Sequence, residues 1–289
     1  MKFFITDVFG KGPYTGNQLA TFFDFGTLPG SEMQKIAREV NFSETTFITS
    51  PEKSNGGYDV RIFTPVNEIG FAGHPTLGTA FIINNHILKN PENKILLNYQ
   101  VGQIPVTVEN DTLWMKQNQP EFGRETDKQL MAQTLGLEIS EIDYRLPVME
   151  LSTGLPFTIV PLKTMKALKK AKVNLLKLEE FIRHAWAKEI LVFSTETYEP
   201  HHSLSTRVFV EYLGIPEDPA TGSATGCLAA YLLKYDVFGT CKIDISAGQG
   251  YEVGRPSELK IKAELKDGVY DINIGGSVTE IAEGEWKIR

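Results

Sequence analysis

The stretches HPTLGTA (His74 to Ala80) and DPATGSA (Asp218 to Ala224) decide the fold of this chain. Both have proline second, glycine fifth and alanine last, and Thr79 of the first matches Ser223 of the second. The 144 residues from His74 to Asp218 are about half of the 289-residue chain. An internal repeat at this spacing predicts two related halves.

Three further pairs of motifs recur in the same order, at offsets between 138 and 152 residues. The pairs are Thr15-Gly16 with Thr153-Gly154, Arg61-Ile62-Phe63 with Arg207-Val208-Phe209, and Val101 to Pro105 with Val253 to Pro256. Agreement between independent motifs favours one duplicated architecture. We therefore expect an α+β protein with two pseudo-symmetric domains, each a mostly antiparallel, barrel-like sheet around a central helix. The boundary should fall near residues 118–147.

Capping signals and apolar patterning predict the helices. Ser31 with Gln34, and Thr126 with Gln129, have the spacing of capping boxes. Segments 76–88 and 223–233 are apolar on most faces, which is typical of buried helices. The turn residues Asn110–Asp111 and Asp267–Gly268 predict β-hairpins.

The composition excludes several classes of function. Lys+Arg 29 against Asp+Glu 36 gives a net charge of −7, without the basic surface that nucleic acids and anionic membranes require. The sequence contains no run of about 18 apolar residues, so no transmembrane helix is expected. The N-terminus does not have the pattern of a signal peptide. Two cysteines, Cys227 and Cys241, cannot form a disulfide framework. We therefore expect a reduced, cytoplasmic protein that binds neither nucleic acid nor membrane.

The repeated motifs predict an anion site at two helix starts. A helix N-terminus presents unpaired backbone N–H groups, and small residues allow an anion to approach them. Gly78-Thr79 and Gly222-Ser223 would supply this arrangement twice, in a cleft between the halves. The alternative is that these are ordinary helix starts, with Thr79 or Ser223 as caps.

Three titratable residues are candidates for chemistry. His74 and Asp218 stand at matched positions of the repeat, and a carboxylate beside an imidazole raises its pKa. Gly73 and Pro75 flank the histidine in a turn before a helix, which favours a site there. Glu44 precedes an apolar strand, and apolar surroundings disfavour a charged carboxylate, so its pKa is expected to rise. The alternative for Glu44 is an exposed loop residue.

Other polar motifs carry weaker signals. The spacings of a P-loop, a dinucleotide-binding motif and a zinc site are absent from the sequence, so no cofactor or metal is expected. His201-His202 is interpreted as a solvated loop pair and Cys227 as a packed thiol. Both cysteines lie in the second half, so they cannot form a matched two-thiol racemase pair.

Five motifs together resemble a known family. They are GNQLATF from Gly16, NFSETTF around Glu44, RIFTP with FAGHPTLG around His74, RVF with EDPATGSATG around Asp218, and QGYEVGRPS from Gln249. In these motifs, which span nearly the whole chain, the sequence resembles the PhzF-like family of phenazine-biosynthesis isomerase-type proteins, within the diaminopimelate-epimerase-like superfamily. The resemblance implies domains 1–120 and 147–278, with 279–289 joining the first, and a homodimer that needs no cofactor.

The resemblance also implies roles for individual residues. Glu44 matches the proton-transferring acid, and His74 and Asp218 match its polar partners. Ser223 with Gly222, and also Gln249 and Asn17, match substrate contacts. Thiol racemases of the superfamily have cysteine where this chain has other residues, so thiol chemistry is not expected.

The resulting hypothesis is an isomerase in which Glu44 moves a proton on a small carboxylic acid. The alternatives are an epimerase, a racemase or a lyase-like proton-abstraction enzyme, and a non-catalytic protein that binds a small anion. A purely structural role leaves the polar residues unexplained.

Overall fold

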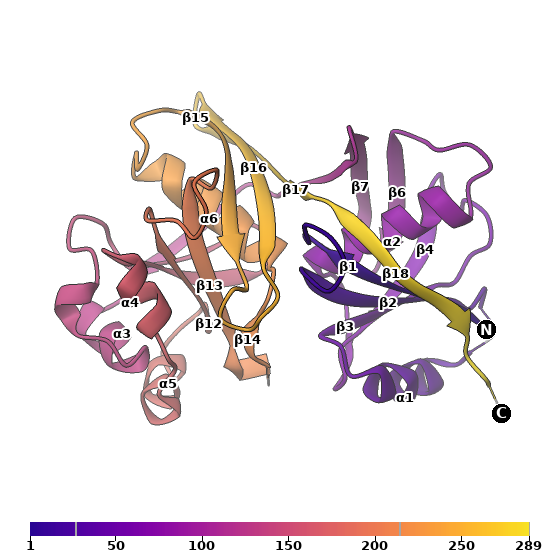
Figure 1. Cartoon of the computed structure of the whole chain (residues 1–289), viewed down its shortest axis with the longest axis horizontal. Coiled ribbons are helices and arrows are strands. Elements are labelled where there is room, and N and C mark those ends of the chain that lie inside the picture. Colours follow the sequence, from indigo (N-terminus) through magenta and orange to yellow (C-terminus); the bar gives the residue numbers. More distant parts are fainter. Residues whose placement is uncertain (27, 214, 289) are drawn as a thin grey trace. The chain divides into compact units, whose positions relative to one another are not determined.

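The chain divides into two compact units, shown in Figure 1 as a computed structural model that describes residues 1–26, 28–213 and 215–288. Unit 1 comprises Met1–Lys116 and Gly275–Arg289, and unit 2 comprises Gln117–Ile274. Arg289, the last residue of the segment expected to join the first domain, lies outside the described residues. The chain therefore passes between the units twice.

Unit 1 is a mixed sheet around helix α2. Its strands are β1 (Lys2–Val8), β2 (Asn17–Phe23), β3 (Glu44–Ile48), β4 (Tyr58–Phe63), β5 (Glu68–Ile69), β6 (Lys94–Tyr99), β7 (Gly102–Glu109), β8 (Thr112–Lys116) and β18 (Val278–Glu285), and its helices are α1 (Gly30–Val40) and α2 (Gly73–His86). Neighbouring strands are antiparallel except for β2 with β3 and β4 with β6. A helix lies between the strands of each parallel pair in the sequence, because a parallel connection needs a long crossover.

Unit 2 has the same plan. Its strands are β9 (Glu121–Glu125), β10 (Met149–Ser152), β11 (Pro156–Pro161), β12 (Glu189–Ser194), β13 (Leu204–Val210), β14 (Ile215–Asp218), β15 (Lys242–Gln249), β16 (Ser257–Lys266) and β17 (Val269–Gly276), and its helices are α3 (Lys128–Thr134), α4 (Met165–Lys170), α5 (Leu175–Ile182) and α6 (Gly222–Lys234), with 3₁₀ turns at Ile139–Glu141 and Glu211–Leu213. The order β18-β1-β2-β3-β4-β6-β7-β8 of unit 1 recurs as β9-β10-β11-β12-β13-β15-β16-β17. The parallel pairs, β11 with β12 and β13 with β15, fall at the same places. The predicted fold class is thus confirmed.

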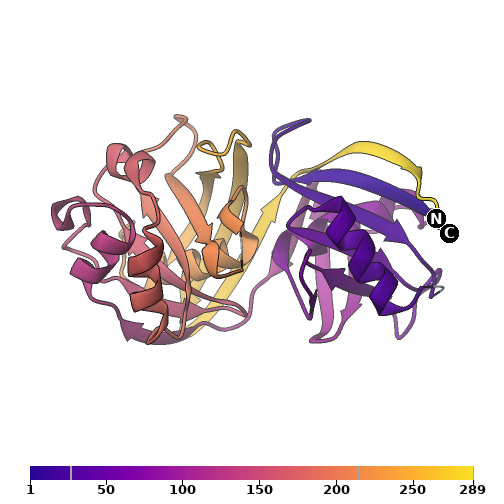
Figure 2. The same ribbon diagram turned by 90° about the horizontal axis from the view of Figure 1, so that it is seen from below.

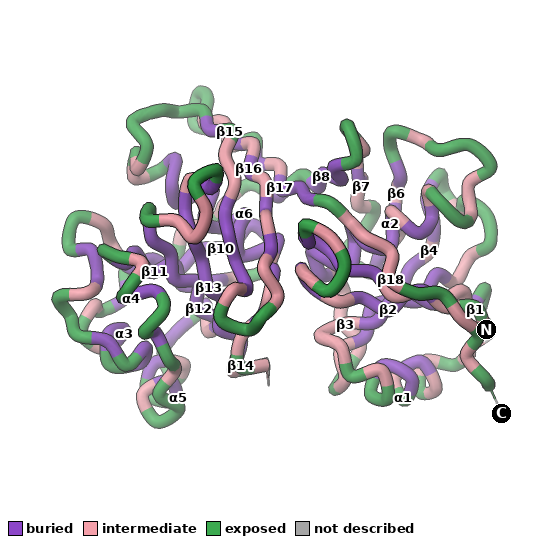
Figure 3. The backbone as a smooth tube through the Cα atoms, viewed as in Figure 1, coloured by how far each residue is buried: buried purple, intermediate pink, exposed green. Residues whose placement is uncertain are grey.

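The helices α2 and α6 are the centres of the two units. All residues from Gly73 to Ala80 and from Gly222 to Leu233 are buried, as the tube in Figure 3 shows. Burial on every side explains why these helices have no polar face. Among the described helices, none has both the length and the hydropathy that crossing a bilayer requires.

Helix α1 covers the other face of the unit 1 sheet, where it is seen in front in Figure 2. Along β2, Ala20 and Phe22 pack with Met33 of α1, whereas the hydroxyl of Thr21, between them, bonds to that of Thr46. This alternation follows from the two-residue period of a strand.

Two predicted capping boxes are wrong in detail. α1 begins at Gly30 after Pro29 with no side-chain cap, and Gln34 Nε2 instead donates to the Thr64 carbonyl at 2.8 Å. α3 is capped by Asp127 and not by Thr126, because the Asp127 carboxylate accepts from the backbone N–H of Leu130.

Both predicted hairpins are confirmed. Asn110 and Asp111 have φ of 46° and 63°, and Asp267 and Gly268 have φ of 51° and 79°. Positive φ at both central residues is the geometry that matches the twist of the flanking strands.

Candidate functional site

Glu44 and His74 meet in unit 1. Glu44 is the first residue of β3, placed by Asn41, whose φ of 56° ends α1, and by the parallel register of Leu19 with Glu44. His74 is the second residue of α2, and its Nε2 atom lies 3.5 Å from Oε2 of Glu44. Both residues lie largely out of solvent, with side chains 5% and 17% exposed. An acid and an imidazole are thus held together at a helix start.

The charge of His74 differs from the sequence-based expectation. Burial lowers its pKa to about 3, and a hydrogen bond with the backbone of Gln18 is the smaller, opposing effect. The expected rise is wrong because removal from water disfavours the imidazolium. His74 is therefore neutral near neutral pH.

Gly78 and Thr79 do not lie at a helix start. α2 begins at Gly73, so both residues are in its second turn. The Thr79 hydroxyl donates to that of Thr46 at 2.9 Å, inside the core. A Cβ on Gly78 would lie 2.5 Å from Cδ2 of Leu19, so this glycine allows the helix to pack against the sheet. The prediction that Gly78 and Thr79 stand at a helix start is wrong, and of the candidate site residues in unit 1, Gly73 and His74 stand in the first turn of α2.

Asn17 begins β2 opposite Val8 and is buried. The turn before it depends on Gly16, whose φ is 74° and whose Cβ would lie 2.3 Å from the Val8 carbonyl oxygen. Contact between Asn17 and a substrate stays a prediction.

In unit 2, Asp218 and Thr221 form a turn that Gln249 holds. The Asp218 carboxylate accepts a short hydrogen bond from the Thr221 hydroxyl. Gln249 Nε2 donates to the Asp218 carbonyl at 2.8 Å and to Oγ1 of Thr221 at 3.1 Å, and its Oε1 accepts from the Thr221 N–H at 3.3 Å. Gln249 is fully buried. It therefore positions the turn, and its side-chain donors are engaged within the protein.

Gly222 and Ser223 are the first two residues of α6, as the motif predicts. Thr221, which the sequence reasoning missed, is the residue before the helix. Its signal was the Asp-x-x-Thr spacing, which brings a hydroxyl back to a carboxylate across a turn.

The structure corrects the register of the repeat. The first residues of α2 and α6, Gly73 and Gly222, are 149 residues apart and not 144. In this register Ser223, and not Asp218, is the counterpart of His74. The fourth helical residue is threonine in both, and each hydroxyl donates to the carbonyl four residues earlier, at 2.7 and 2.9 Å.

An arginine–glutamate pair supports the same register. Arg61 donates twice to Glu68, with both distances 2.7 Å, and Arg207 donates twice to Glu217, at 3.0 and 2.7 Å. The two glutamates are also 149 residues apart. Each pair joins the strand before the central helix to the short strand leading into it.

The cysteines do not stand at the helix starts. Cys227 lies inside α6 with no exposed surface, and burial raises its pKa to about 11. It is a packed thiol, as predicted. Since His74 and Ser223 occupy the equivalent first-turn positions, the described chain has no thiol pair there.

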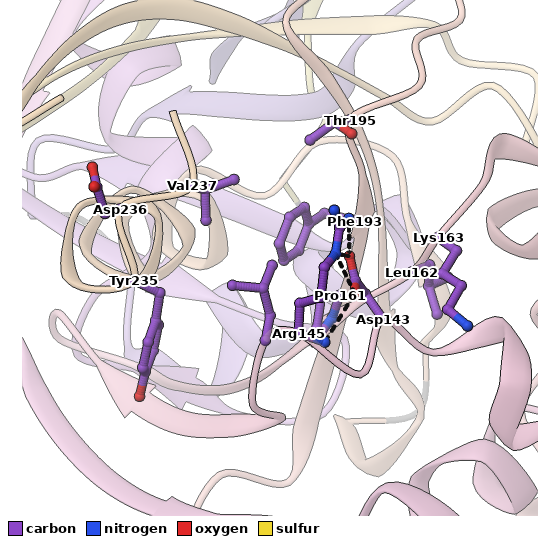
Figure 4. Close-up of a pocket in the computed structure, with 11 residues that line it drawn as sticks. Asp143, Arg145, Pro161, Leu162, Lys163, Phe193, Thr195, Tyr235, Asp236 and Val237 are labelled. Atoms are coloured by element: carbon purple, nitrogen blue, oxygen red, sulfur yellow. Dashed lines mark hydrogen bonds and ion pairs between the residues drawn. The ribbon is translucent and has the colours of Figure 1, made fainter. Parts of the chain in front are cut away.

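A pocket of about 360 Å³ lies elsewhere in unit 2 (Figure 4). Its lining includes Phe193, Tyr235 and the ion pair of Arg145 with Asp143, which are 2.6 Å apart. Tyr235 follows the C-terminal end of α6, whereas Ser223 lies at the N-terminal end, about 20 Å away for a helix of this length. Within unit 2 the pocket is therefore separate from Ser223 and the start of α6.

Comparisons with known proteins agree with this fold. The family model of phenazine biosynthesis-like proteins matches residues 6–284. The chain is similar to trans-2,3-dihydro-3-hydroxyanthranilate isomerase of Pseudomonas fluorescens, at 34% identity over 91% of this chain and 90% of that protein.

Two solved structures are similar over nearly their whole length. A phenazine biosynthesis protein of the PhzF family from Bacillus anthracis has a TM-score of 0.90 and 28% identity, covering 100% of this chain and 99% of that chain. A probable proline racemase from Agrobacterium radiobacter has a TM-score of 0.66 at 10% identity, covering 100% and 93% of the two chains. The second likeness extends to the fold alone.

Proposed function

Because this chain belongs to the family of phenazine biosynthesis-like proteins and is an isomerase, we propose that it moves a proton on a small carboxylic acid with Glu44 as the acid–base group. The observation that carries the proposal is the buried pair of Glu44 and His74, whose Oε2 and Nε2 atoms are 3.5 Å apart. In this reaction a carbon–hydrogen bond breaks, the carboxylate of Glu44 takes the proton, and the same group returns it to another carbon.

The neutral state of His74 suits this role for Glu44. A cationic neighbour would stabilise the carboxylate and weaken it as a base, whereas a neutral imidazole does not. The neutral ring also keeps one N–H donor and one acceptor nitrogen, with which it can orient the carboxyl group or a substrate oxygen. His74 thus acts by hydrogen bonding and not as an imidazolium.

Asp218 and Ser223 are proposed as substrate-positioning groups, together with Asn17, Gly73 and Gly222. Support comes from the turn that Gln249 and Thr221 fix before α6, and from the two small residues at the start of that helix. The backbone N–H groups of a helix start stabilise a carboxylate or a developing enolate. Chemistry of this kind uses the chain's own residues and requires no cofactor.

The relatives support a substrate class. Curated relatives at 32–34% identity act as trans-2,3-dihydro-3-hydroxyanthranilate isomerases, so we propose a cyclic, unsaturated amino acid of this type. We also propose a homodimer, as the family resemblance implies; sedimentation equilibrium would test this, and a monomer would contradict it. A cytoplasmic location is proposed from the composition and the two cysteines.

The test is deuterium uptake from D₂O into a panel of such acids, with product formation followed in parallel. Wild-type protein should form a product with a shifted double bond. Glu44→Gln should lose turnover by about 100-fold or more, because acid–base catalysis contributes on that order, while its circular dichroism stays native. Glu32→Gln is the matched control, since the Glu32 side chain lies on α1, is about half exposed and pairs with Lys35 at 2.7 Å.

Three results would contradict the proposal. Wild-type rates in Glu44→Gln would exclude Glu44 as the proton carrier. A product of inverted stereochemistry with unchanged bonding would favour an epimerase. Saturable binding without any product would favour an anion-binding protein. Product formation must be measured because a proton returned internally leaves no deuterium in the product.

A further inference from the structure

Two adjacent histidines in unit 2 lie beside a glutamate of a neighbouring strand. His201 and His202 precede β13, and Glu258 is the second residue of β16. One side-chain donor atom from each of the three lies within 4.8 Å of the others. The interpretation of both histidines as solvated is wrong for His202, which is only 5% exposed.

The loop that carries the histidines is fixed by its backbone. The N–H of His202 donates to the Glu199 carbonyl at 3.0 Å, and that of Ser203 donates to the Ser246 carbonyl at 2.9 Å. The chain then enters β13, which pairs in parallel with β15 at Leu204 and Ala247. The backbone that carries the two imidazoles is therefore held in place by hydrogen bonds.

Gly248 makes room for the buried ring. A Cβ at this position would lie 2.5 Å from Nδ1 of His202, so any other residue would displace the imidazole. Gly248 is also the direct register partner of Glu258 in the antiparallel pair of β15 with β16. The missing side chain thus lets His202 lie over the strand pair next to the Glu258 carboxylate.

The surroundings are negatively charged. Nε2 of His201 lies 3.7 Å from Oε1 of Glu258, and its Nδ1 lies 3.6 Å from Oε2 of Glu199. Glu199 is itself held by the hydroxyl of Tyr251. Two carboxylates within reach of the histidines favour a bound cation.

We propose that His201, His202 and Glu258 form a binding site for Zn²⁺ or a similar divalent transition metal. Ligands about 2.0–2.1 Å from tetrahedral zinc are about 3.4 Å from each other, so the 3.7 Å between His201 and Glu258 is close to the required spacing. Two imidazole nitrogens and one carboxylate oxygen suit zinc better than Mg²⁺, which prefers oxygen ligands. His201 is half exposed, which leaves an entry path and a fourth position for water.

The test is isothermal titration of the full, untagged chain with ZnCl₂ near neutral pH. A Cys241→Ser background removes the exposed thiol, which would bind zinc by itself. One Zn²⁺ per chain is expected, and Co²⁺ should give the visible absorption of a tetrahedral site. His201→Gln and Glu258→Gln should each weaken binding by about tenfold or more, the scale of loss when even an outer partner of a metal site is removed.

His86→Gln is the matched control. His86 of unit 1 also contacts a glutamate, with its Nε2 2.7 Å from Oε2 of Glu280, but among the described residues that pair is in no group of three ligands. Zinc affinity should be unchanged in this variant. The proposal is overturned by the absence of saturable zinc binding, by an affinity that His201→Gln or Glu258→Gln leaves unaltered, or by an equal loss in His86→Gln.

Discussion

The buried neutral state of His74 predicts that unit 1 becomes less stable in acid. In the unfolded chain the imidazole titrates at its ordinary pKa of 6.5, whereas in the folded protein the pKa is about 3. Between these values the unfolded state binds a proton that the folded state does not. Stability contributed by this group is therefore complete above pH about 6.5 and is lost as the pH falls.

The magnitude follows from the two pKa values. Each pH unit between them corresponds to about 1.4 kcal/mol for one proton. From pH about 7 to pH about 5, His74 alone should lower the free energy of unfolding by about 2 kcal/mol. Replacement by glutamine removes the titrating group, so the free-energy difference between wild type and His74→Gln should shift by this amount over the same range.

Urea unfolding followed by tryptophan fluorescence measures this difference for unit 1. Trp114 and Trp286 lie in unit 1 and Trp186 lies in unit 2, so a Trp186→Phe background confines the signal to unit 1. Titrating groups that do not contact His74 cancel in the comparison. Parallel pH profiles for the two proteins would refute the reasoning, since they would mean that His74 binds a proton equally well in both states.

Two further predictions concern unit 2. Burial, with a smaller contribution from Glu211, raises the pKa of Glu189 to about 8 in the folded protein. The contribution of Glu189 to stability is therefore fully present below its unfolded pKa of about 4.5 and is lost as the pH rises toward 8. Glu189→Gln should flatten this loss, on the order of 3 kcal/mol by pH about 7, in urea titrations read from Trp186; an unchanged slope would contradict it. Gln249→Leu should destabilise unit 2 by about 1–3 kcal/mol because it leaves buried backbone groups of Asp218 and Thr221 unpaired, and it should lower isomerase turnover although the side chain only positions the turn. Native turnover with lowered stability would show that the turn does not position the substrate.

The sequence pattern could predict the duplicated fold because the features that define it are local. The apolar faces of α2 and α6 and the Asn110–Asp111 turn each depend on neighbouring residues only. The exact register of the repeat could not be predicted, since α2 and α6 start without a side-chain cap that would mark their first residue. The shared proline, glycine and alanine of the two motifs therefore align Asp218 with His74, whereas the helix starts align Ser223 with His74.

Burial of single polar residues depended on distant partners. His202 is buried because Gly248 of another strand leaves space for its ring, and the His74 pKa falls because the helix start is enclosed. The sequence position of Gln249 could not reveal that three hydrogen bonds tie its side chain to the turn of Asp218 and Thr221. Such relations arise only from the folded packing.

The pairing of β18 with β1 has a consequence for how the protein is made. On the ribosome, β1 emerges before unit 2, but β18, the strand that covers its second edge, emerges after unit 2. Unit 2 is one continuous segment, so it can finish folding while unit 1 still waits for β18. Throughout that delay β1 presents an open strand edge, the kind of surface that recruits other chains. Termination of translation before β18 would therefore leave unit 1, which contains the Glu44–His74 pair, without its edge strand.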